Sequence, residues 1–308
     1  MRIDSLIEAI ERTKNPTALG LDTRIEHLPR SLTDGLTTRG LKNEDEVRAA
    51  CSSIYSFNRA LIDALADVVP CVKVQVAWYE MLGVPGMKLF RDTLIHARQK
   101  GMITIADVKR NDIGVTVEAY AAAYLEENSP FPVDFVTINP YLGTDGMTPF
   151  LDACKKNGGG IFVLVRTSNP SAGEFQDLIV QDGEDPGGKG RPFYEHVGEK
   201  VAEWGKELMG RHGYSSVGAV VGATCPEEGK NLRALLPRTF FLVPGYGAQG
   251  ATARDLAGCF DERGRGAVVN ASRSLLCAHE KRNTEDFVSA AHDEALRMKD
   301  DLRAAIGI

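Results

Sequence analysis

Acidic and basic side chains alternate near the end of one apolar run of the sequence. Asp107 and Lys109 stand two residues apart, and Asp112 follows three residues later. Residues two apart on a β-strand share a face, so Asp107 and Lys109 should point together. Ala106 and Val108 should then pack against the outer helices. An ammonium fixed beside carboxylates can stabilise a developing negative charge and donate a proton, so this spacing indicates acid–base chemistry. A salt bridge at a strand end would show the same pattern.

A lysine also stands inside a valine-rich run, from Cys71 to Ala77. Lys73 and Gln75 share one face of this run, and the valines share the other. Helices cover the outer face of a parallel sheet, so Lys73 should face the interior and pair with an acid on the next strand. Asp107 is the nearest candidate. A lysine that reaches solvent from the strand end is the alternative.

Three further features are suited to hold a phosphorylated sugar. Asp22 ends an apolar run and can accept hydrogen bonds from a sugar hydroxyl, or else cap the following turn. Residues 244–250 contain three glycines, whose backbone N–H groups can approach an anion closely. Arg273 follows the next apolar run and can bind a phosphate bidentately. The alternative is two ordinary turns and a surface arginine.

These residues lie at the ends of short apolar runs that alternate with segments long enough for helices. Such alternation predicts parallel βαβ units, and eight runs predict a closed (β/α)8 TIM barrel with active groups at the carboxyl ends of its strands. A doubly wound open sheet is the alternative. The runs are Ala18–Asp22, Cys71–Ala77, Met102–Lys109, Phe135–Pro140, Gly160–Arg166, Val217–Ala223, Phe240–Pro244 and Ala267–Asn270.

Three segments lie outside this repeat. Residues 1–14 have the apolar spacing of an amphipathic helix and lack the apolar core of a signal peptide. Residues 24–45 and 167–192 are longer than ordinary loops, and the second should emerge on the catalytic side of a barrel or be a tolerated surface insertion. We expect one barrel domain over residues 1–308, with an N-terminal helix and this long loop.

The composition limits the classes of function. Of 308 residues, 43% are hydrophobic and 25% are charged, which excludes wholesale disorder. The net charge of −6 disfavours binding to nucleic acid or to an anionic membrane surface. No apolar run approaches the ~18 residues of a membrane span. Six cysteines without a C-x-x-C pair indicate reduced thiols and a cytoplasmic protein.

Taken together, these motifs resemble the orotidine 5′-phosphate decarboxylase family, in its longer bacterial branch. The D-x-K-x-x-D core occurs in a wider group of barrels, but Lys73 and the Gln249/Arg273 pair narrow the choice. Asn111 departs from the glycine that many members carry there, and Arg166 has no explanation in the sequence. The matching segments are Gly20-Leu-Asp22, Val72-Lys-Val-Gln75, Ala106-Asp-Val-Lys-Arg-Asn-Asp-Ile-Gly114, Thr167-Ser-Asn-Pro170, Pro244-Gly-Tyr-Gly-Ala-Gln-Gly250 and Asn270-Ala-Ser-Arg-Ser-Leu275.

The resemblance implies a homodimer of barrels that converts orotidine 5′-phosphate to UMP and CO2, the last step of UMP synthesis, with no metal or organic cofactor. It also implies a role for each matching residue. Lys109 would donate the proton, Asp107 would lie near the departing carboxylate, and Lys73 and Asp112 would complete a chain of alternating charges. Asp112 and Thr116 would come from the partner subunit. Asp22 and Lys73 would contact the ribose, Ser168 would contact the pyrimidine, and Gln249 and Arg273 would bind the phosphate.

Two other functions remain open from the sequence. A Mg²⁺-dependent phosphosugar lyase of the same wider group would share the D-x-K-x-x-D core. Such enzymes carry an acid where Lys73 stands, and a lysine there would repel the metal. A barrel that binds nucleotides without catalysis is the second alternative, although every catalytic position is filled.

Overall fold

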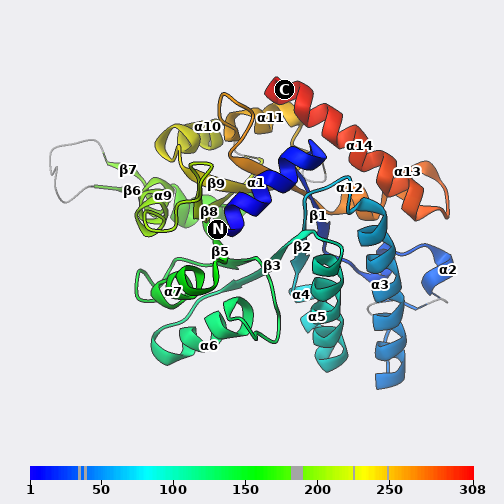
Figure 1. The fold of residues 1–308 in the computed structure, drawn as a ribbon. Helices are drawn as coiled ribbons and strands as arrows, with labels where there is room; N and C mark the ends of the chain where they lie inside the picture. Colours follow the sequence, from blue (N-terminus) through cyan, green and yellow to red (C-terminus); the bar gives the residue numbers. More distant parts are fainter. Residues whose placement is uncertain (34–35, 38–39, 182–189, 225, 248–249) are drawn as a thin grey trace.

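The chain folds as a closed barrel of eight parallel strands, with neighbours in the order β1-β10-β9-β8-β5-β4-β3-β2 (Figure 1). The computed structural model describes residues 1–33, 36–37, 40–181, 190–224, 226–247 and 250–308. The predicted (β/α)8 barrel is confirmed, and the open sheet is wrong. The barrel strands are β1 Thr17–Leu21, β2 Cys71–Gln75, β3 Ile103–Arg110, β4 Phe135–Ile138, β5 Gly160–Arg166, β8 Ser215–Val221, β9 Thr239–Pro244 and β10 Ala267–Ala271.

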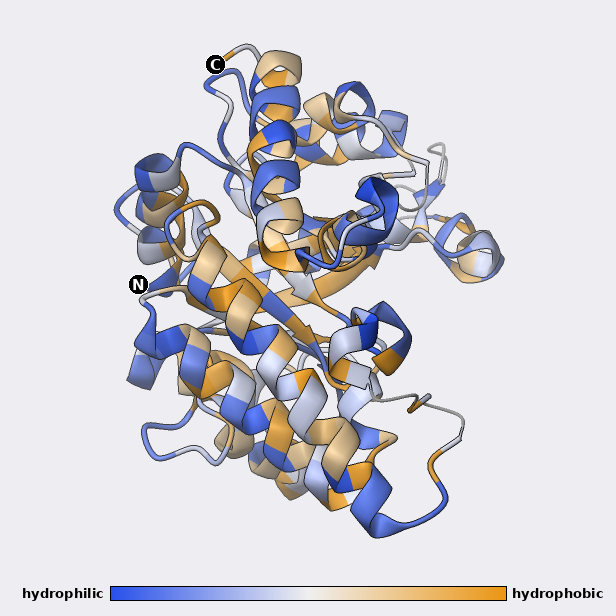
Figure 2. Ribbon diagram, turned by 90° about the vertical axis from the view of Figure 1, so that its right-hand side faces the viewer, coloured by the Kyte–Doolittle hydropathy of each residue, from blue (hydrophilic) through white to orange (hydrophobic). Residues whose placement is uncertain are grey.

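Helices connect successive strands and cover the outside of the barrel. Their inward faces are apolar, as in α3, where Phe57, Leu61 and Leu65 are fully buried. Figure 2 shows the same division, with hydrophobic strands inside and helices that are hydrophilic on one side. No helix among the described residues combines the length and the apolarity needed to cross a membrane. The longer helices are α3 Glu44–Leu65, α5 Gly83–Gln99, α6 Gly114–Leu125, α7 Thr148–Asn157, α9 Phe193–Trp204, α10 Pro226–Leu235 and α14 Phe287–Ile306; the short ones are α4 Ala77–Glu80, α11 Ala253–Leu256, η3 Ala257–Cys259, α12 Arg273–Leu276 and α13 Ala278–Arg282.

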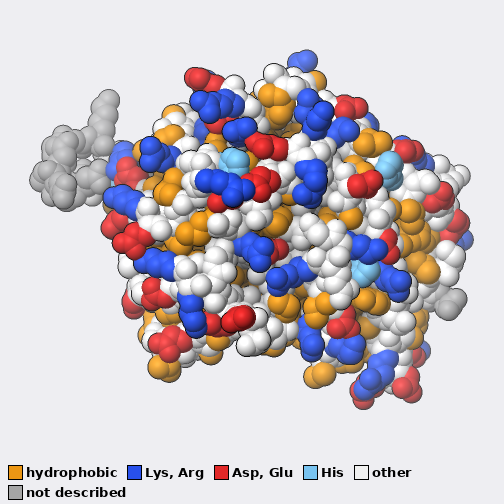
Figure 3. Space-filling model, viewed as in Figure 1, with side chains coloured by type: hydrophobic (Ala, Val, Ile, Leu, Met, Phe, Trp, Pro, Cys, Tyr) orange, Lys and Arg blue, Asp and Glu red, His pale blue; other side chains and the backbone are white. Residues whose placement is uncertain are grey.

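The N-terminal helix α1 (Arg2–Thr13) closes one end of the barrel. Its Ile3, Leu6 and Ile7 form one buried cluster with the inward-facing Phe135 and Phe162. In Figure 1 this helix lies across the front of the barrel. Figure 3 shows basic and acidic side chains interspersed on the same face. Since α1 covers the end at which the strands begin, access to the interior is left to their carboxyl ends.

All the boundaries of the barrel strands match the sequence prediction within two residues, and two of the small differences lie near the site. The first strand ends at Leu21, so Asp22 stands just beyond it. The second ends at Gln75 rather than Ala77 because Val76 takes helical dihedral angles and begins the turn into α4. Both changes lengthen the loops on the carboxyl side of the barrel, where the candidate residues gather.

Both long loops contain short elements of regular structure in their described parts. The first contains η1 (Ile25–His27) and α2 (Arg30–Thr33). The second contains η2 (Pro170–Ala172), α8 (Gly173–Gln176) and an antiparallel pair of short strands, β6 (Ile179–Val180) and β7 (Arg191–Pro192). These elements follow β5 and stand at the carboxyl end of the barrel.

Leu6→Ala should destabilise the protein by about 2–5 kcal/mol, because it removes a fully buried side chain from the cluster that joins α1 to the barrel. Urea unfolding measures the change. Arg12, exposed on the same helix, gives the matched control, and Arg12→Ala should shift the free energy of unfolding by no more than about 0.5 kcal/mol. Equal effects of the two substitutions would show that α1 does not seal the barrel.

Candidate active site

A cavity of about 700 Å³ opens at the carboxyl ends of the strands. Asp22, Lys73, Asp107, Lys109, Ser168 and Arg273 of the sequence prediction all line it. Its remaining lining is Arg24, His27, Gln75, Trp78, Thr137, Leu164, Thr167, Asn169, Gln176, Val220, Leu242, Pro244, Gly245, Tyr246, Asn270 and Ser272. The cavity is large enough for a nucleotide-sized ligand.

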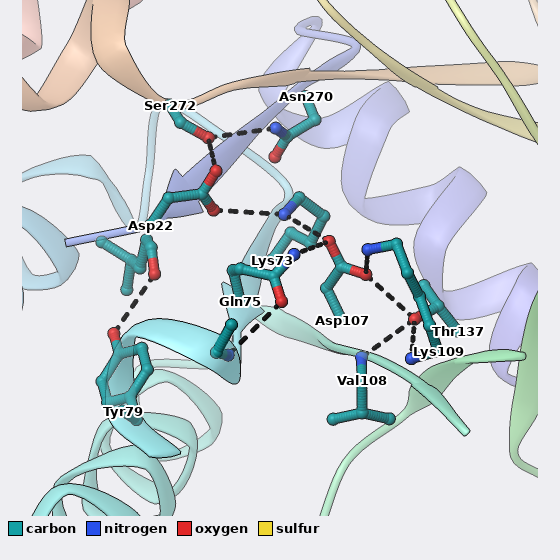
Figure 4. A network of polar contacts seen from close by, with 12 residues as sticks. Asp22, Lys73, Gln75, Tyr79, Asp107, Val108, Lys109, Thr137, Asn270 and Ser272 are labelled. Atoms are coloured by element: carbon teal, nitrogen blue, oxygen red, sulfur yellow. Dashed lines mark hydrogen bonds and ion pairs between the residues drawn. The ribbon is translucent and has the colours of Figure 1, made fainter. Parts of the chain in front are cut away.

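The carboxylate of Asp107 lies at the centre of the charged residues (Figure 4). Its Oδ2 accepts hydrogen bonds from Lys73 Nζ and from Gln75 Nε2, both at 2.9 Å. Its Oδ1 accepts one from Lys109 Nζ at 2.5 Å and one from Thr137 Oγ1 at 3.0 Å. The period-two pairing predicted for Asp107 with Lys109, and the cross-strand pairing with Lys73, are both present.

Lys73 connects this carboxylate to a second one. Its Nζ lies 3.2 Å from Asp22 Oδ1, and its side chain is only 5% exposed. Asp22 Oδ2 accepts a hydrogen bond of 3.0 Å from Ser272 Oγ, at the end of β10. The charges therefore alternate from Asp22 through Lys73 and Asp107 to Lys109 across three neighbouring strands.

Mutual attraction fixes the charge states of the two buried members of this chain. Burial by itself raises the pKa of Asp107, but Lys73 and Lys109 outweigh it and hold that pKa well below its usual range. Burial likewise lowers the pKa of Lys73, and the carboxylates of Asp107 and Asp22 raise it overall. Asp107 is thus a carboxylate and Lys73 an ammonium at neutral pH.

Lys109 adopts a backbone conformation that is unusual for its residue type. Its φ is +46°, in the left-handed region, and the register between β3 and β4 shifts around it. Thr137 Oγ1, on β4, accepts hydrogen bonds from the backbone N–H groups of both Val108 and Lys109 at 2.9 Å. This threonine therefore stabilises a kink that directs Lys109 toward Asp107. Asn111, which replaces the glycine of many family members, does not have a positive φ.

A basic end of the cavity follows the neighbouring strands β9 and β10, where Gly245, Tyr246 and Arg273 line it. Gln249, the second predicted phosphate ligand, lies outside the described residues. Arg24 and His27, which the sequence analysis did not single out, stand at the same end and follow Asp22 in the chain.

Two predicted residues do not reach the cavity of their own chain. Asp112 and Thr116 follow β3, but neither lines the cavity. Asp112 Oδ1 accepts a hydrogen bond of 2.8 Å from the backbone N–H of Ile113 at the start of α6, and Thr116 is exposed on that helix. Within one chain, the alternating charges therefore end at Lys109.

Arg166, unexplained in the sequence, attaches the insertion after β5 to the barrel. Its guanidinium donates to Gln176 Oε1 at 3.2 Å and pairs with Asp177 at 3.3 Å and Glu228 at 3.7 Å. Gln176 also accepts from the backbone N–H of Thr167 at 2.9 Å. These contacts hold α8 beside Ser168 at the edge of the cavity.

The comparisons with known proteins agree with this geometry. A sequence profile described as the orotidine 5′-phosphate decarboxylase / HUMPS family matches residues 56–285, which is most of the chain. The chain belongs to this family. An orotidine 5′-phosphate decarboxylase of Rhodopirellula baltica is 45% identical over 301 residues, covering 96% of this chain and 93% of that protein. One from Clostridium perfringens is 40% identical over 307 residues and covers 99% of each. The structure of Leishmania donovani OMP decarboxylase matches with a TM-score of 0.75 at 25% identity, covering 99% of both chains.

The buried charge of Asp107 should make stability depend on pH. Its pKa is depressed in the folded state, so the unfolded chain takes up a proton near pH ~4 while the folded chain does not. Its contribution is therefore present above pH ~4 and is lost as the pH falls toward the folded-state value. The free energy of unfolding of the wild type, minus that of Asp107→Asn, should decrease between about pH 6 and about pH 3. A difference that stays constant over this range would contradict the assigned charge state.

Proposed function

We propose that this chain decarboxylates orotidine 5′-phosphate to UMP and CO2, the last step of UMP synthesis. The observation that carries the proposal is the Lys109 ammonium, 2.5 Å from the buried carboxylate of Asp107, in a cavity that Arg273 also lines. Membership of the family and the names of the relatives over nearly their whole length support the same reaction.

The chemistry needs a cation beside C6 of the pyrimidine. The C6–carboxylate bond breaks, CO2 leaves, and the electron pair remains at C6, where the ring delocalises it poorly. Lys109 stabilises this charge and then donates a proton to C6, which gives UMP. The lysine regains its proton from solvent, so the overall reaction consumes one proton and releases one CO2.

Asp107 acts on the same step in two ways. It holds Lys109 in position, and it would face the substrate carboxylate, whose negative charge it repels. Loss of CO2 removes that repulsion. This division of labour requires no metal or organic cofactor, and we propose that the enzyme uses none.

The remaining cavity residues suit the rest of the nucleotide. Asp22, Lys73 and Ser168 all line the cavity, and we propose that the first two bind ribose hydroxyls and that Ser168 contacts the pyrimidine. Arg273 would bind the phosphate, together with Gln249. These assignments extend the alternating charges into a binding site for the whole substrate.

We propose that the site is completed by a second copy of the chain, with Asp112 and Thr116 entering the partner's cavity. The support is the exposed apolar side chains beside them in the chain: Val115 is 79% exposed, and Ile113 is 54% exposed. Helix α6, on which Thr116 lies, is apolar on nearly all sides, which is typical of a helix buried by a partner. The expected protein is a cytoplasmic homodimer with no nucleic-acid or membrane partner.

The Mg²⁺-dependent lyase is disfavoured by the position of Lys73. Its Nζ lies 3.2 Å from Asp22 Oδ1 and 2.9 Å from Asp107 Oδ2. A divalent cation bound here would need these two carboxylates as ligands, but the ammonium already occupies the space between them. Purified protein should therefore convert orotidine 5′-phosphate to UMP at an unchanged rate in excess EDTA, followed by the ultraviolet absorbance. If the protein does not turn over the substrate even without EDTA, the non-catalytic barrel is favoured. If EDTA abolishes turnover, the metal-dependent lyase is favoured.

Mixing two inactive variants tests the shared site. Lys109→Ala and Asp112→Ala homodimers should each be nearly inactive. In an equal mixture, random pairing makes about half of the dimers heterodimers. Each heterodimer has one site with both residues intact and one site that lacks both. Activity should therefore recover to roughly a quarter of wild type.

The control for this experiment replaces the Asp112→Ala chain by the double variant Lys109→Ala/Asp112→Ala, which can form no intact site. Mass spectrometry of labelled subunits verifies exchange. If subunits exchange and the first mixture stays inactive, Asp112 does not serve the partner's site.

A further inference from the structure

An arginine outside the resemblance shares the basic end of the cavity with Arg273. Arg24 stands two residues after Asp22, in the loop between β1 and η1, and its side chain lines the cavity. Strands β1 and β10 are neighbours in the barrel, so the loops that carry Arg24 and Arg273 are adjacent. Lys109 stands on β3, which is separated from β1 by β2.

Two aromatic side chains hold the guanidinium of Arg24 in place. His27 Nε2 lies 2.8 Å from its Nη2 and 3.1 Å from its Nε. The guanidinium also stacks over Trp78, with its carbon 5.1 Å from the ring centroid. Contacts of this kind immobilise a flexible side chain before any ligand arrives, which lowers the entropic cost of binding.

The side chain that Arg24 contacts through hydrogen bonds is a neutral one. Burial, and after it the charge of Arg24, lowers the pKa of His27 to about 4, so the imidazole is neutral at pH 7. Among the described residues, no carboxylate forms an ion pair with Arg24 or Arg273. The carboxylates of Glu280 and Glu26 raise the pKa of His27, and Arg273 lowers it, so both guanidinium groups and two carboxylates lie within electrostatic reach of one imidazole.

We propose that Arg24 is a second cationic ligand of the substrate phosphate, held in position by His27 and Trp78 and acting beside Arg273. Two guanidinium groups that form no ion pair with a described carboxylate, at one end of a cavity, suit a dianion, because each can form charge-assisted hydrogen bonds with it. This inference rests on the proposed function for the identity of the substrate, but the phosphate site can be tested without turnover.

The test compares UMP with uridine, which differs only by lacking the phosphate. NMR titration follows both ligands, since it reaches millimolar dissociation constants. Arg24→Gln should weaken UMP binding roughly 10- to 100-fold, the value of a hydrogen bond to a charged group, and change uridine binding less than about twofold. Arg24→Lys should lose less UMP affinity than Arg24→Gln, because lysine keeps the positive charge. It should still bind UMP more weakly than the wild type, because it lacks the planar, stacked guanidinium. Arg48→Gln, at an exposed position on α3, is the control and should alter neither ligand.

Two results would overturn the proposal. Unchanged UMP binding by Arg24→Gln would remove Arg24 from the site, and an equal loss for UMP and uridine would make it a structural residue. Arg273→Gln serves as the reference for a phosphate ligand, with the same selectivity for UMP expected. If the wild type binds UMP more tightly than uridine but never turns over orotidine 5′-phosphate, the proposed function fails while the role of Arg24 is still decided.

Discussion

The structure of the site depends on one carboxylate that is shared by two ammonium groups. Asp107 is 9% exposed, and each of its oxygens accepts from one lysine and one neutral donor. A buried charge of this kind is tolerated only when its partners are complete. Lys73 and Lys109 are therefore positioned by the same interaction that makes burial of Asp107 possible, and a reactive ammonium is held in place before a substrate binds.

The barrel supplies the positions for this arrangement. Parallel register places Gln75 opposite Asp107 and Gly20 opposite Lys73, so adjacent strands end together and their polar side chains meet at one rim. Gly20 leaves room beside Asn270 and Ser272, because a Cβ there would lie 2.1 Å from the Ser272 hydroxyl oxygen. Helix α1 closes the opposite end, which leaves the carboxyl rim as the open side of the interior.

The sequence predicted the barrel and the pairing of Lys73 with Asp107 because period-two alternation is strict in buried strands. It missed Thr137, since a single threonine in an apolar strand looks like any β-branched residue. Thr137 accepts a hydrogen bond from the backbone N–H of Lys109, and this contact depends on the positive φ of Lys109. The alternation of apolar and polar residues gives no sign of a positive φ.

Longer-range features were also hidden in the sequence. The partners of Arg166 lie ten or more positions away, so its part in attaching the insertion could not be inferred from spacing. Arg24 was missed for a related reason, because its significance comes from Trp78, more than fifty positions later, and from a neutral His27. The predicted roles of Asp112 and Thr116 need a second chain, and that of Gln249 concerns a residue outside the described part.

The central claim is that Lys109 supplies the cation and the proton at C6. The most direct measurement compares Lys109→Ala with the wild type in two assays, CO2 release from orotidine 5′-phosphate and UMP binding, alongside Lys88→Ala as an exposed-lysine control. We expect Lys109→Ala to fold, to bind UMP within roughly tenfold of the wild type and to release no measurable CO2. Turnover near the wild-type rate by folded Lys109→Ala would contradict the account.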